Sequence, residues 1–396
     1  MRGGRYRGFT TQRGVASILA AFVMLLIGAT IFFSWYMLRE PPVRRPSWDG
    51  AVWAPNDWDT LELLDVDDDG SLLVAFYDGA KQVSDFEGAS QSAGQLPGVA
   101  LVSPDGVSHV LRATAPLDRH AVGSATGSVH DGAIAVAWQV VDNAVDTAGK
   151  VKYGSPGPTA SVATGILAGL SDTPTPTIDG APVVVEWGRL HVADGALVAF
   201  VIDAGDNWSG AQHIGLMNTG TGAIDVIHEG ASLAPLRDLC DPTGNTFGAG
   251  VTENHAITVF QFTVVGGKAA NASMVPAPPV AGNMLPVNAC GVDGARVEIG
   301  TRTLYWKDGN GKTSMTPMDG LAGDVFLAPK WLAVHTIEPG GDLNEVVLVD
   351  RSTRMPTKVS DSCGRVVPAG DWLAFGYPDG GRCVPVAVRV STLLTP

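Results

Sequence analysis

The chain has 396 residues, of which 45% are hydrophobic and 17% charged, and it carries a formal net charge of −14 at pH 7. An acidic balance of this size argues against a nucleic-acid partner, because phosphate binding needs a clustered positive surface. The acidic residues are spread through turn segments, which is typical of a solvated surface on a large globular body.

The N-terminal end divides into a basic leader, residues 1–14, and an apolar run, residues 15–38. The run contains no charged residue, and as a helix it would measure about 36 Å, enough to cross a bilayer core of about 30 Å. Arginine is the only charged residue type in the leader, and positive charge stays on the cytoplasmic side. The sequence therefore predicts a single-pass protein of the cell membrane, with a cytoplasmic N-terminus and an extracellular C-terminal body.

The apolar run is too long for a removable secretory signal, whose apolar core spans roughly 7–15 residues, so a retained signal anchor is one expectation. The other comes from Arg13-Gly14-Val15-Ala16, which resembles the class III cleavage site of archaeal type IV pilins and archaellins. That resemblance implies an archaeal protein cut between Gly14 and Val15, whose freed helix packs in a filament or stays in the membrane as a minor component. Leu19 departs from the pattern, because many pilins carry Glu at this mature position. Both alternatives stay open.

Residues 39–54 form a predicted proline-rich linker, since Pro41, Pro42 and Pro46 keep the chain extended. The predicted body spans residues 55–396. Short apolar strands preceded by tight turns recur along it, for example SLLVAFYD (71–78), GAIAVAWQV (132–140), GALVAFVID (195–203) and WLAFGY (372–377). Asp-Gly pairs before several of these strands fit two-residue hairpins, and the lack of clean alternation indicates strands buried on both faces.

A second hairpin follows many of these strands, as in residues 98–114 and 214–230. Two hairpins make a four-stranded meander, and about seven such units of roughly 50 residues predict an all-β fold, a β-propeller of about seven four-stranded blades preceded by one N-terminal transmembrane α-helix. The body resembles generic β-propellers of the quinoprotein-like or TolB-like kind. Two consecutive β-sandwiches are the alternative architecture.

The chain has four cysteines, and all of them lie beyond the apolar run: Cys240, Cys290, Cys363 and Cys383. None forms a CxxC or a Cys/His metal spacing, and an even number in an exported domain predicts two disulfides. Three pairings are open, of which we favour Cys363–Cys383 and Cys240–Cys290. Four buried free thiols are the alternative.

The segment DVDDDGSLL places Asp65, Asp67 and Asp69 in the pattern D-x-D-x-D-G, the first half of a calcium loop. Alternate carboxylates can converge on a hard cation, and the glycine permits the sharp bend. Phe76 stands where the glutamate of a complete loop is expected, so an acidic hairpin turn without a metal is the alternative. Calcium is the one cofactor that the sequence indicates.

Asn207 and Asn271 each begin an N-glycosylation sequon, Asn207-Trp-Ser209 and Asn271-Ala-Ser273. An exported body would present such sites to a glycosylation system. Chance also produces sequons in a chain of this length.

No G-x-S-x-G elbow or H-E-x-x-H helix occurs, and the arginines and histidines of the body are scattered. We therefore expect a membrane-anchored, surface-exposed β-propeller for extracellular recognition or adhesion, with a protein or glycan ligand, rather than an enzyme. A minor pilin-like component is a narrower form of this expectation. The alternatives are an exported glycan-acting hydrolase or lyase, with acids gathered from distant blades, and an envelope-assembly scaffold.

Overall fold

The computed structural model describes most of the chain from residue 45 to residue 394, in these ranges: 45–55, 58, 60–77, 82–84, 90–93, 95–117, 121–142, 144–145, 151–152, 156–166, 169–203, 211–230, 246–253, 256–276, 284–287, 295–298, 303–307, 313–318, 321–328, 330–337 and 344–394. The predicted leader and membrane helix, with Gly14 and Val15, lie outside these ranges. Within them, we find no helix with the length and apolar character needed to span a membrane. The chain divides into two units, Met1–Pro46 and Ser47–Pro396, and all described strands belong to the second.

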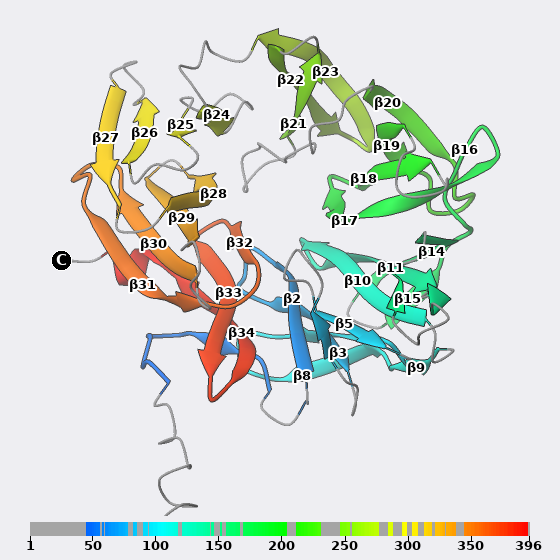
Figure 1. Cartoon of the computed structure of the whole chain (residues 1–396), viewed down its shortest axis with the longest axis horizontal. Helices are drawn as coiled ribbons and strands as arrows, with labels where there is room; N and C mark the ends of the chain where they lie inside the picture. Colours follow the sequence, from blue (N-terminus) through cyan, green and yellow to red (C-terminus); the bar gives the residue numbers. More distant parts are fainter. Residues whose placement is uncertain are drawn as a thin grey trace, which may run out of the picture. The chain divides into compact units, whose positions relative to one another are not determined.

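The strands of the second unit form seven sheets of three or more strands in the described residues, which we call blades 1 to 7 in chain order (Figure 1). Blade 1 contains β2 (Thr60–Val66), β3 (Leu72–Tyr77), β7 (Gly98–Val102) and β8 (Ser108–Arg112). Blade 2 contains β4 (Gln82–Ser84), β5 (Ser90–Ala93), β10 (Ala121–His130), β11 (Ala133–Asp142), β14 (Pro156–Ile166) and β15 (Gly169–Asp172). Blade 3 contains β16 (Thr177–Ile178), β17 (Ala181–Ala193), β18 (Ala196–Asp203), β19 (Gln212–Met217) and β20 (Ile224–Gly230).

Blades 4 to 7 follow in chain order. Blade 4 contains β21 (Thr246–Glu253), β22 (Ala256–Val265) and β23 (Lys268–Pro276), and blade 5 contains β24 (Met284–Val287), β25 (Ala295–Glu298), β26 (Thr303–Lys307) and β27 (Thr313–Pro317). Blade 6 contains β28 (Leu321–Leu327), β29 (Trp331–Ile337), β30 (Asn344–Asp350) and β31 (Pro356–Ser362). Blade 7 contains β32 (Val366–Ala369), β33 (Trp372–Asp379), β34 (Arg382–Arg389) and β1 (Val52–Trp53).

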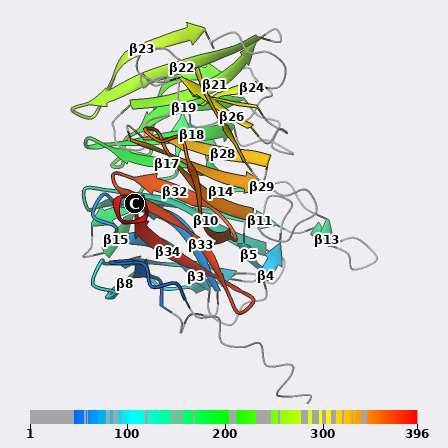
Figure 2. The ribbon, with the colours of Figure 1, turned by 90° about the vertical axis from the view of Figure 1, so that its left-hand side faces the viewer.

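Two short strand pairs and one helical turn lie outside the blades. The pairs β6 (Gln95–Leu96) with β9 (Ala115–Pro116) and β12 (Ala144–Val145) with β13 (Val151–Lys152) are two-stranded, and α2 (Val390–Leu393) is a single helical turn after β34. Figure 2, a side view, shows β13 standing out on the same side of the second unit as β4.

Buried apolar clusters join successive blades face to face. Strand β3 is an example, since all six of its residues are buried. On one face Leu72 and Val74 pack towards blade 7, and on the other Leu73 and Ala75 pack towards blade 2. Similar clusters join blade 2 to blade 3, blade 3 to blade 4, blade 5 to blade 6, and blade 6 to blade 7. A sheet in a sandwich buries one face, whereas these sheets bury both, which is the arrangement of a β-propeller. The all-β prediction is confirmed.

Blade 7 is completed by the strand nearest the N-terminus. Strand β1 pairs antiparallel with β34, with Val52 opposite Ala387 and Trp53 opposite Val386. The outermost strand of the last blade therefore comes from the start of the body, which holds the first and last parts of the unit together. The predicted linker, residues 39–54, thus differs from the structure at its end, because β1 belongs to a blade.

Blades 2 and 3 have more than the predicted four strands, and blade 4 has three in the described residues. The β4–β5 hairpin, which follows β3 in the chain, pairs with β10 of blade 2, through Val122–Ala93 and Gly123–Ser92. The extra pairs β14–β15 and β16–β17 explain the long spacing between the apolar strands at residues 132 and 195.

The predicted disulfide Cys363–Cys383 is confirmed, with the two Cα atoms 5.7 Å apart. The disulfide passes over β33 at Gly376. A β-carbon at this residue would collide with the Cys363 carbonyl oxygen and the Cys383 sulfur. The bridge therefore ties β34 to the segment before β32. Cys240 and Cys290 lie outside the described residues.

Candidate functional site

The candidate site is formed by two hairpin turns on neighbouring blades, the β2–β3 turn of blade 1 and the β10–β11 turn of blade 2. Both are acidic and both use left-handed backbone. Gly70 has a φ of +94°, and Asp131 and Gly132 have φ values of +50° and +73°. Consecutive positive φ angles are those of a type I′ hairpin turn, which explains the Asp-Gly pair at residues 131–132.

Carboxylates of the first turn accept hydrogen bonds from backbone amides of the second. Asp67 Oδ1 accepts from the amide of Asp131 at 3.0 Å, and Asp67 Oδ2 accepts from the amide of Gly132 at 3.0 Å. Asp65 Oδ2 accepts from the amide of Val129 at 2.9 Å. Hydrogen bonds to charged acceptors are stronger than those between neutral groups, so these partly buried contacts, which we call the turn clasp, fix the two turns relative to each other.

Burial of the Asp65 carboxylate raises its pKa above the usual value, although the amide of Val129 and the hydroxyl of Ser128 act against this shift. A contact of the same kind joins blade 2 to blade 3. There, Ser128 Oγ accepts a hydrogen bond from the amide of Val192 at 3.2 Å. The polar contact from one blade to the next is therefore repeated, with Ser128 replacing the acid.

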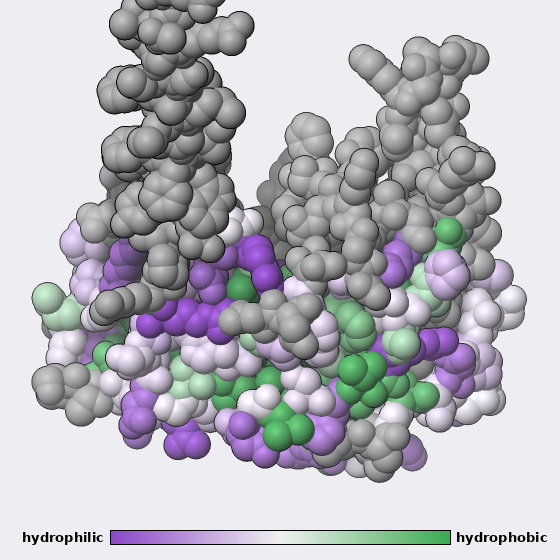
Figure 3. All heavy atoms as spheres, turned by 90° about the horizontal axis from the view of Figure 1, so that it is seen from below, coloured by the Kyte–Doolittle hydropathy of each residue, from purple (hydrophilic) through white to green (hydrophobic). Residues whose placement is uncertain are grey.

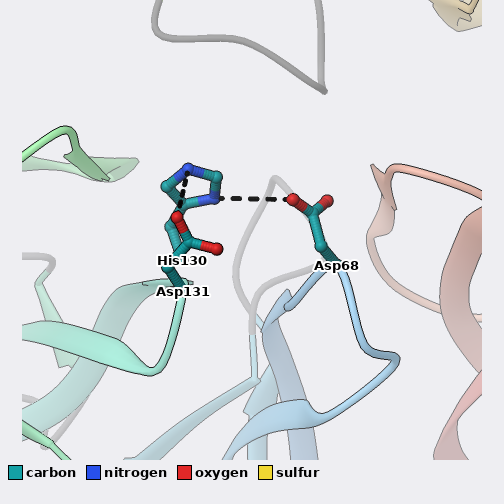
Figure 4. Close-up of side chains that lie close together, drawn as sticks. All are labelled: Asp68, His130 and Asp131. Atoms are coloured by element: carbon teal, nitrogen blue, oxygen red, sulfur yellow. Dashed lines mark ion pairs between the residues drawn. The ribbon is translucent and has the colours of Figure 1, made fainter.

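Three side chains of the two turns lie close together: Asp68, His130 and Asp131 (Figure 4). His130 Nδ1 lies 4.0 Å from Asp68 Oδ2, and His130 Nε2 lies 3.7 Å from Asp131 Oδ2. The His130 side chain is 27% exposed, whereas those of Asp68 and Asp131 are 43% and 84% exposed. We call this group the turn triad.

The electrostatic environment of the turn triad is acidic. Partial burial raises the pKa of Asp68, and the carboxylates of Asp67, Asp131 and Asp69 act in the same direction, while His130 opposes them. A cationic group placed here would relieve this repulsion.

The donor set of the turn triad is one imidazole nitrogen and two carboxylate oxygens, all within 4.8 Å of one another. Imidazole and carboxylate ligands together suit Zn²⁺ or Mn²⁺ with open positions left for water. The same exposed carboxylates can also accept hydrogen bonds from ammonium or guanidinium groups.

The carboxylates of Asp65, Asp67 and Asp69 were expected to converge on a calcium ion, but each accepts a hydrogen bond from a backbone amide instead. Asp65 and Asp67 bind amides of blade 2, and Asp69 Oδ1 accepts from the amide of Ser71 within its own turn at 2.7 Å. In the part of the chain that the structure describes, the group within coordination distance is the turn triad. The sequence identified the right turn but missed His130, because spacing within one hairpin carries no signal about the neighbouring blade.

The other predicted sites lie elsewhere. Asn271 is exposed on β23 of blade 4, and Asn207 lies outside the described residues. Figure 3, seen from below, shows hydrophobic residues in small patches separated by hydrophilic ones on that face of the second unit.

No family model matches the chain, and no curated protein matches it. Solved structures that are similar include an oligogalacturonate lyase from Vibrio parahaemolyticus (12% identity, 85% of this chain and 91% of that chain, TM-score 0.46). TolB from Acinetobacter baumannii is similar over 78% of both chains at 13% identity with a TM-score of 0.37. The β-propeller domain of the Trilobed protease from Pyrococcus furiosus is similar over 85% of this chain and all of that domain, at 10% identity and a TM-score of 0.45. Similar structures thus include β-propeller proteins, while the sheet order and the closure by β1 carry the fold assignment.

Proposed function

We propose that this chain is a membrane-anchored β-propeller displayed outside the cell, where it recognises a partner protein through the turn triad. The single observation that carries the proposal is the disulfide Cys363–Cys383 on the blade that β1 completes. Disulfides persist in oxidising compartments and are rare in the cytosol. The uncharged run at residues 15–38, ahead of a body with such a bridge, supports an N-terminal anchor with the body on the outer side.

The chemistry of the turn triad supports a cationic partner surface. Asp68 and Asp131 are exposed, and Asp67 accepts hydrogen bonds from the backbone amides of both, which fixes their backbone before any partner arrives. Preorganised groups lose less conformational entropy on binding. The net charge of −14 favours approach of a positively charged surface.

Protease access tests the location. Proteinase K is added to intact cells that contain the full-length chain, and the body is followed with an antibody to its C-terminal end. We expect degradation without lysis. Protection until the cells are lysed would overturn the proposed location.

N-terminal sequencing tests the narrower pilin-like form of the proposal. A mature chain that begins at Val15 and is found in sheared surface material supports processing after Gly14. A chain that keeps the leader and stays with the membranes supports a plain signal anchor.

Zero-length crosslinking tests the recognition surface. A carbodiimide joins carboxylates to amines, so treatment of intact cells should link the full-length chain to an amine-bearing partner protein. We expect the double variant Asp68→Asn, Asp131→Asn to lose most of this product. Asp225→Asn is the matched control, because Asp225 is an exposed carboxylate on β20 of blade 3. Equal crosslinking in the two variants would overturn the assignment to the turn triad.

A further inference from the structure

The sequon Asn271-Ala272-Ser273 lies in β23, the end strand of blade 4 in the described residues, where the sheet order is β21-β22-β23. Figure 1 shows β23 on the outer side of this blade. An end strand presents backbone groups and side chains to solvent on its open edge. Among the described strands, β23 pairs only with β22, so a large modification on its other edge displaces no described strand.

The backbone at the sequon is bulged. Gln261 of β22 lies opposite Ser273, and Thr263 lies opposite Ala270, so two residues of β23 stand against one of β22. Asn271 has a φ of +55°. Asparagine is among the residues that tolerate this left-handed conformation, and a bulge frees the extra residue from regular pairing.

The bulge turns the acceptor towards solvent. The four residues 271–274 are all exposed, although strands with one covered face alternate between buried and exposed positions. The Asn271 amide and the Ser273 hydroxyl are thus both accessible, and these are the two groups that define the sequon.

We propose that Asn271 carries an N-linked glycan. This inference rests on the proposed export, because the donor, an oligosaccharide joined to a membrane lipid through phosphate, is used on the outer side of the membrane. In the transfer, the Asn271 side-chain nitrogen forms a bond to the anomeric carbon of the first sugar. The bond between that carbon and the lipid phosphate breaks, the lipid phosphate leaves with the electron pair, and the amide releases one proton.

A glycan at this position covers part of the open edge of β23, which includes one exposed apolar side chain. Met274, three residues after Asn271 on the same strand, is 43% exposed. Exposed strand edges with apolar side chains promote edge-to-edge association, and natural proteins protect them with bulges, charges or covering groups. The glycan adds a covering group to an edge that already has a bulge.

Mass spectrometry of the full-length protein, isolated from membranes of its own cells, tests the proposal. We expect the peptide that contains Asn271 to be heavier than its sequence mass by the mass of a saccharide. Chemical deglycosylation should remove this added mass. Two variants remove the site by different routes. Asn271→Gly deletes the acceptor but keeps a residue that accepts positive φ, and Ser273→Ala deletes the hydroxyl but keeps the amide. Ser273→Thr, which preserves the sequon, is the matched control.

We expect complete loss of the adduct in the first two variants and its retention in Ser273→Thr. We also expect Ser273→Ala to aggregate several-fold faster than Ser273→Thr, measured by light scattering, because only the latter keeps the covering group. An unmodified Asn271 peptide, in a body that proteinase K degrades on intact cells, would overturn the glycan and leave the proposed function standing. A body that is protected on intact cells and also unmodified would overturn both.

Discussion

The indole ring of Trp372 lies over Gly70, so that a β-carbon added to Gly70 would come within 2.5 Å of the ring. Trp372 begins β33 of blade 7, and Gly70 lies in the β2–β3 turn of blade 1 with a φ of +94°. We expect Gly70→Ala to lower the free energy of unfolding by about 2–4 kcal/mol, since it adds both left-handed strain and a steric overlap. Urea unfolding measures the loss.

Gly106→Ala separates these two causes. Gly106 has a φ of +80°, but a β-carbon there would meet no heavy atom within 4 Å. We expect a loss of about 1–2 kcal/mol from backbone strain alone. Equal losses in the two variants would contradict the role of Trp372.

The turn clasp predicts that Asp67 stabilises the junction of blades 1 and 2. Asp67→Ala leaves the amides of Asp131 and Gly132 without their carboxylate partner, and Asp67 itself is only 6% exposed. We expect a loss of about 2–4 kcal/mol in unfolding free energy, because removal of a charged acceptor leaves donors unsatisfied. Asp69→Ala is the control, since Asp69 is exposed and accepts from Ser71 within its own turn, with no hydrogen bond to blade 2 among the described contacts. A comparable loss there would mean that the inter-blade contacts have no special value.

The repeated hairpins could be predicted from sequence because their signals are local. The residues of β3 form an apolar run after an Asp-Gly turn, and burial of every one of them follows from packing between two blades. The pairing of Cys363 with Cys383 could also be predicted, because the two residues flank one hairpin and are separated by 20 residues.

Long-range contacts could not be predicted in the same way. The pairing of β1 with β34 joins the two ends of the body, and the β4–β5 hairpin leaves its sequence neighbours to pair with β10. His130 joined the candidate site only because blade packing brings its turn beside Asp68. The spacing of apolar residues and the choice of turn residues specify each hairpin separately. They carry no information on which hairpins pack or pair with each other in the folded protein.

Asp65 predicts a pH dependence of stability. Burial raises the pKa of Asp65 above 3.8 in the folded state, so the folded protein binds more protons than the unfolded chain between 3.8 and the folded-state pKa. The contribution of Asp65 to the unfolding free energy therefore falls as the pH rises through this window. The pKa of the partly exposed Asp68 is also raised, and its contribution to the pH dependence has the same sign.

Asp65→Asn tests this assignment. The variant cannot ionise at residue 65, so we expect the difference in unfolding free energy between about pH 4, near the unfolded-state pKa, and about pH 7 to shrink relative to the unsubstituted chain. Asp105→Asn, at an exposed turn of blade 1, should leave the difference unchanged. An undiminished pH dependence in Asp65→Asn would assign it to other groups.

The aromatic contacts of Trp48 hold the first residues of the body against blade 7. Its ring stacks on Trp53 at 5.7 Å and meets Phe375 and Tyr377 edge-on. We expect Trp48→Ala to expose residues 47–53 to protease with a several-fold higher cleavage rate, because aromatic pairs contribute about 0.5–1.5 kcal/mol each. Limited proteolysis followed by N-terminal sequencing measures this rate. Unchanged cleavage would show that β1 pairing alone holds the segment.

Because a disulfide ties two segments of blade 7 together, we expect the unfolding free energy of the protein to depend on whether this bond is oxidised or reduced. Cys363→Ala with Cys383→Ala removes a bridge between residues separated by 20 positions, and a loop of this size corresponds to about 3 kcal/mol of unfolding free energy. Reductant should lower the stability of the unsubstituted chain by a similar amount, because it breaks the same bond. The double variant is the control for this measurement: any effect of reductant that remains there belongs to Cys240 and Cys290. A double variant as stable as the oxidised chain would mean that pairing of β34 with β33 and β1 is sufficient to close blade 7.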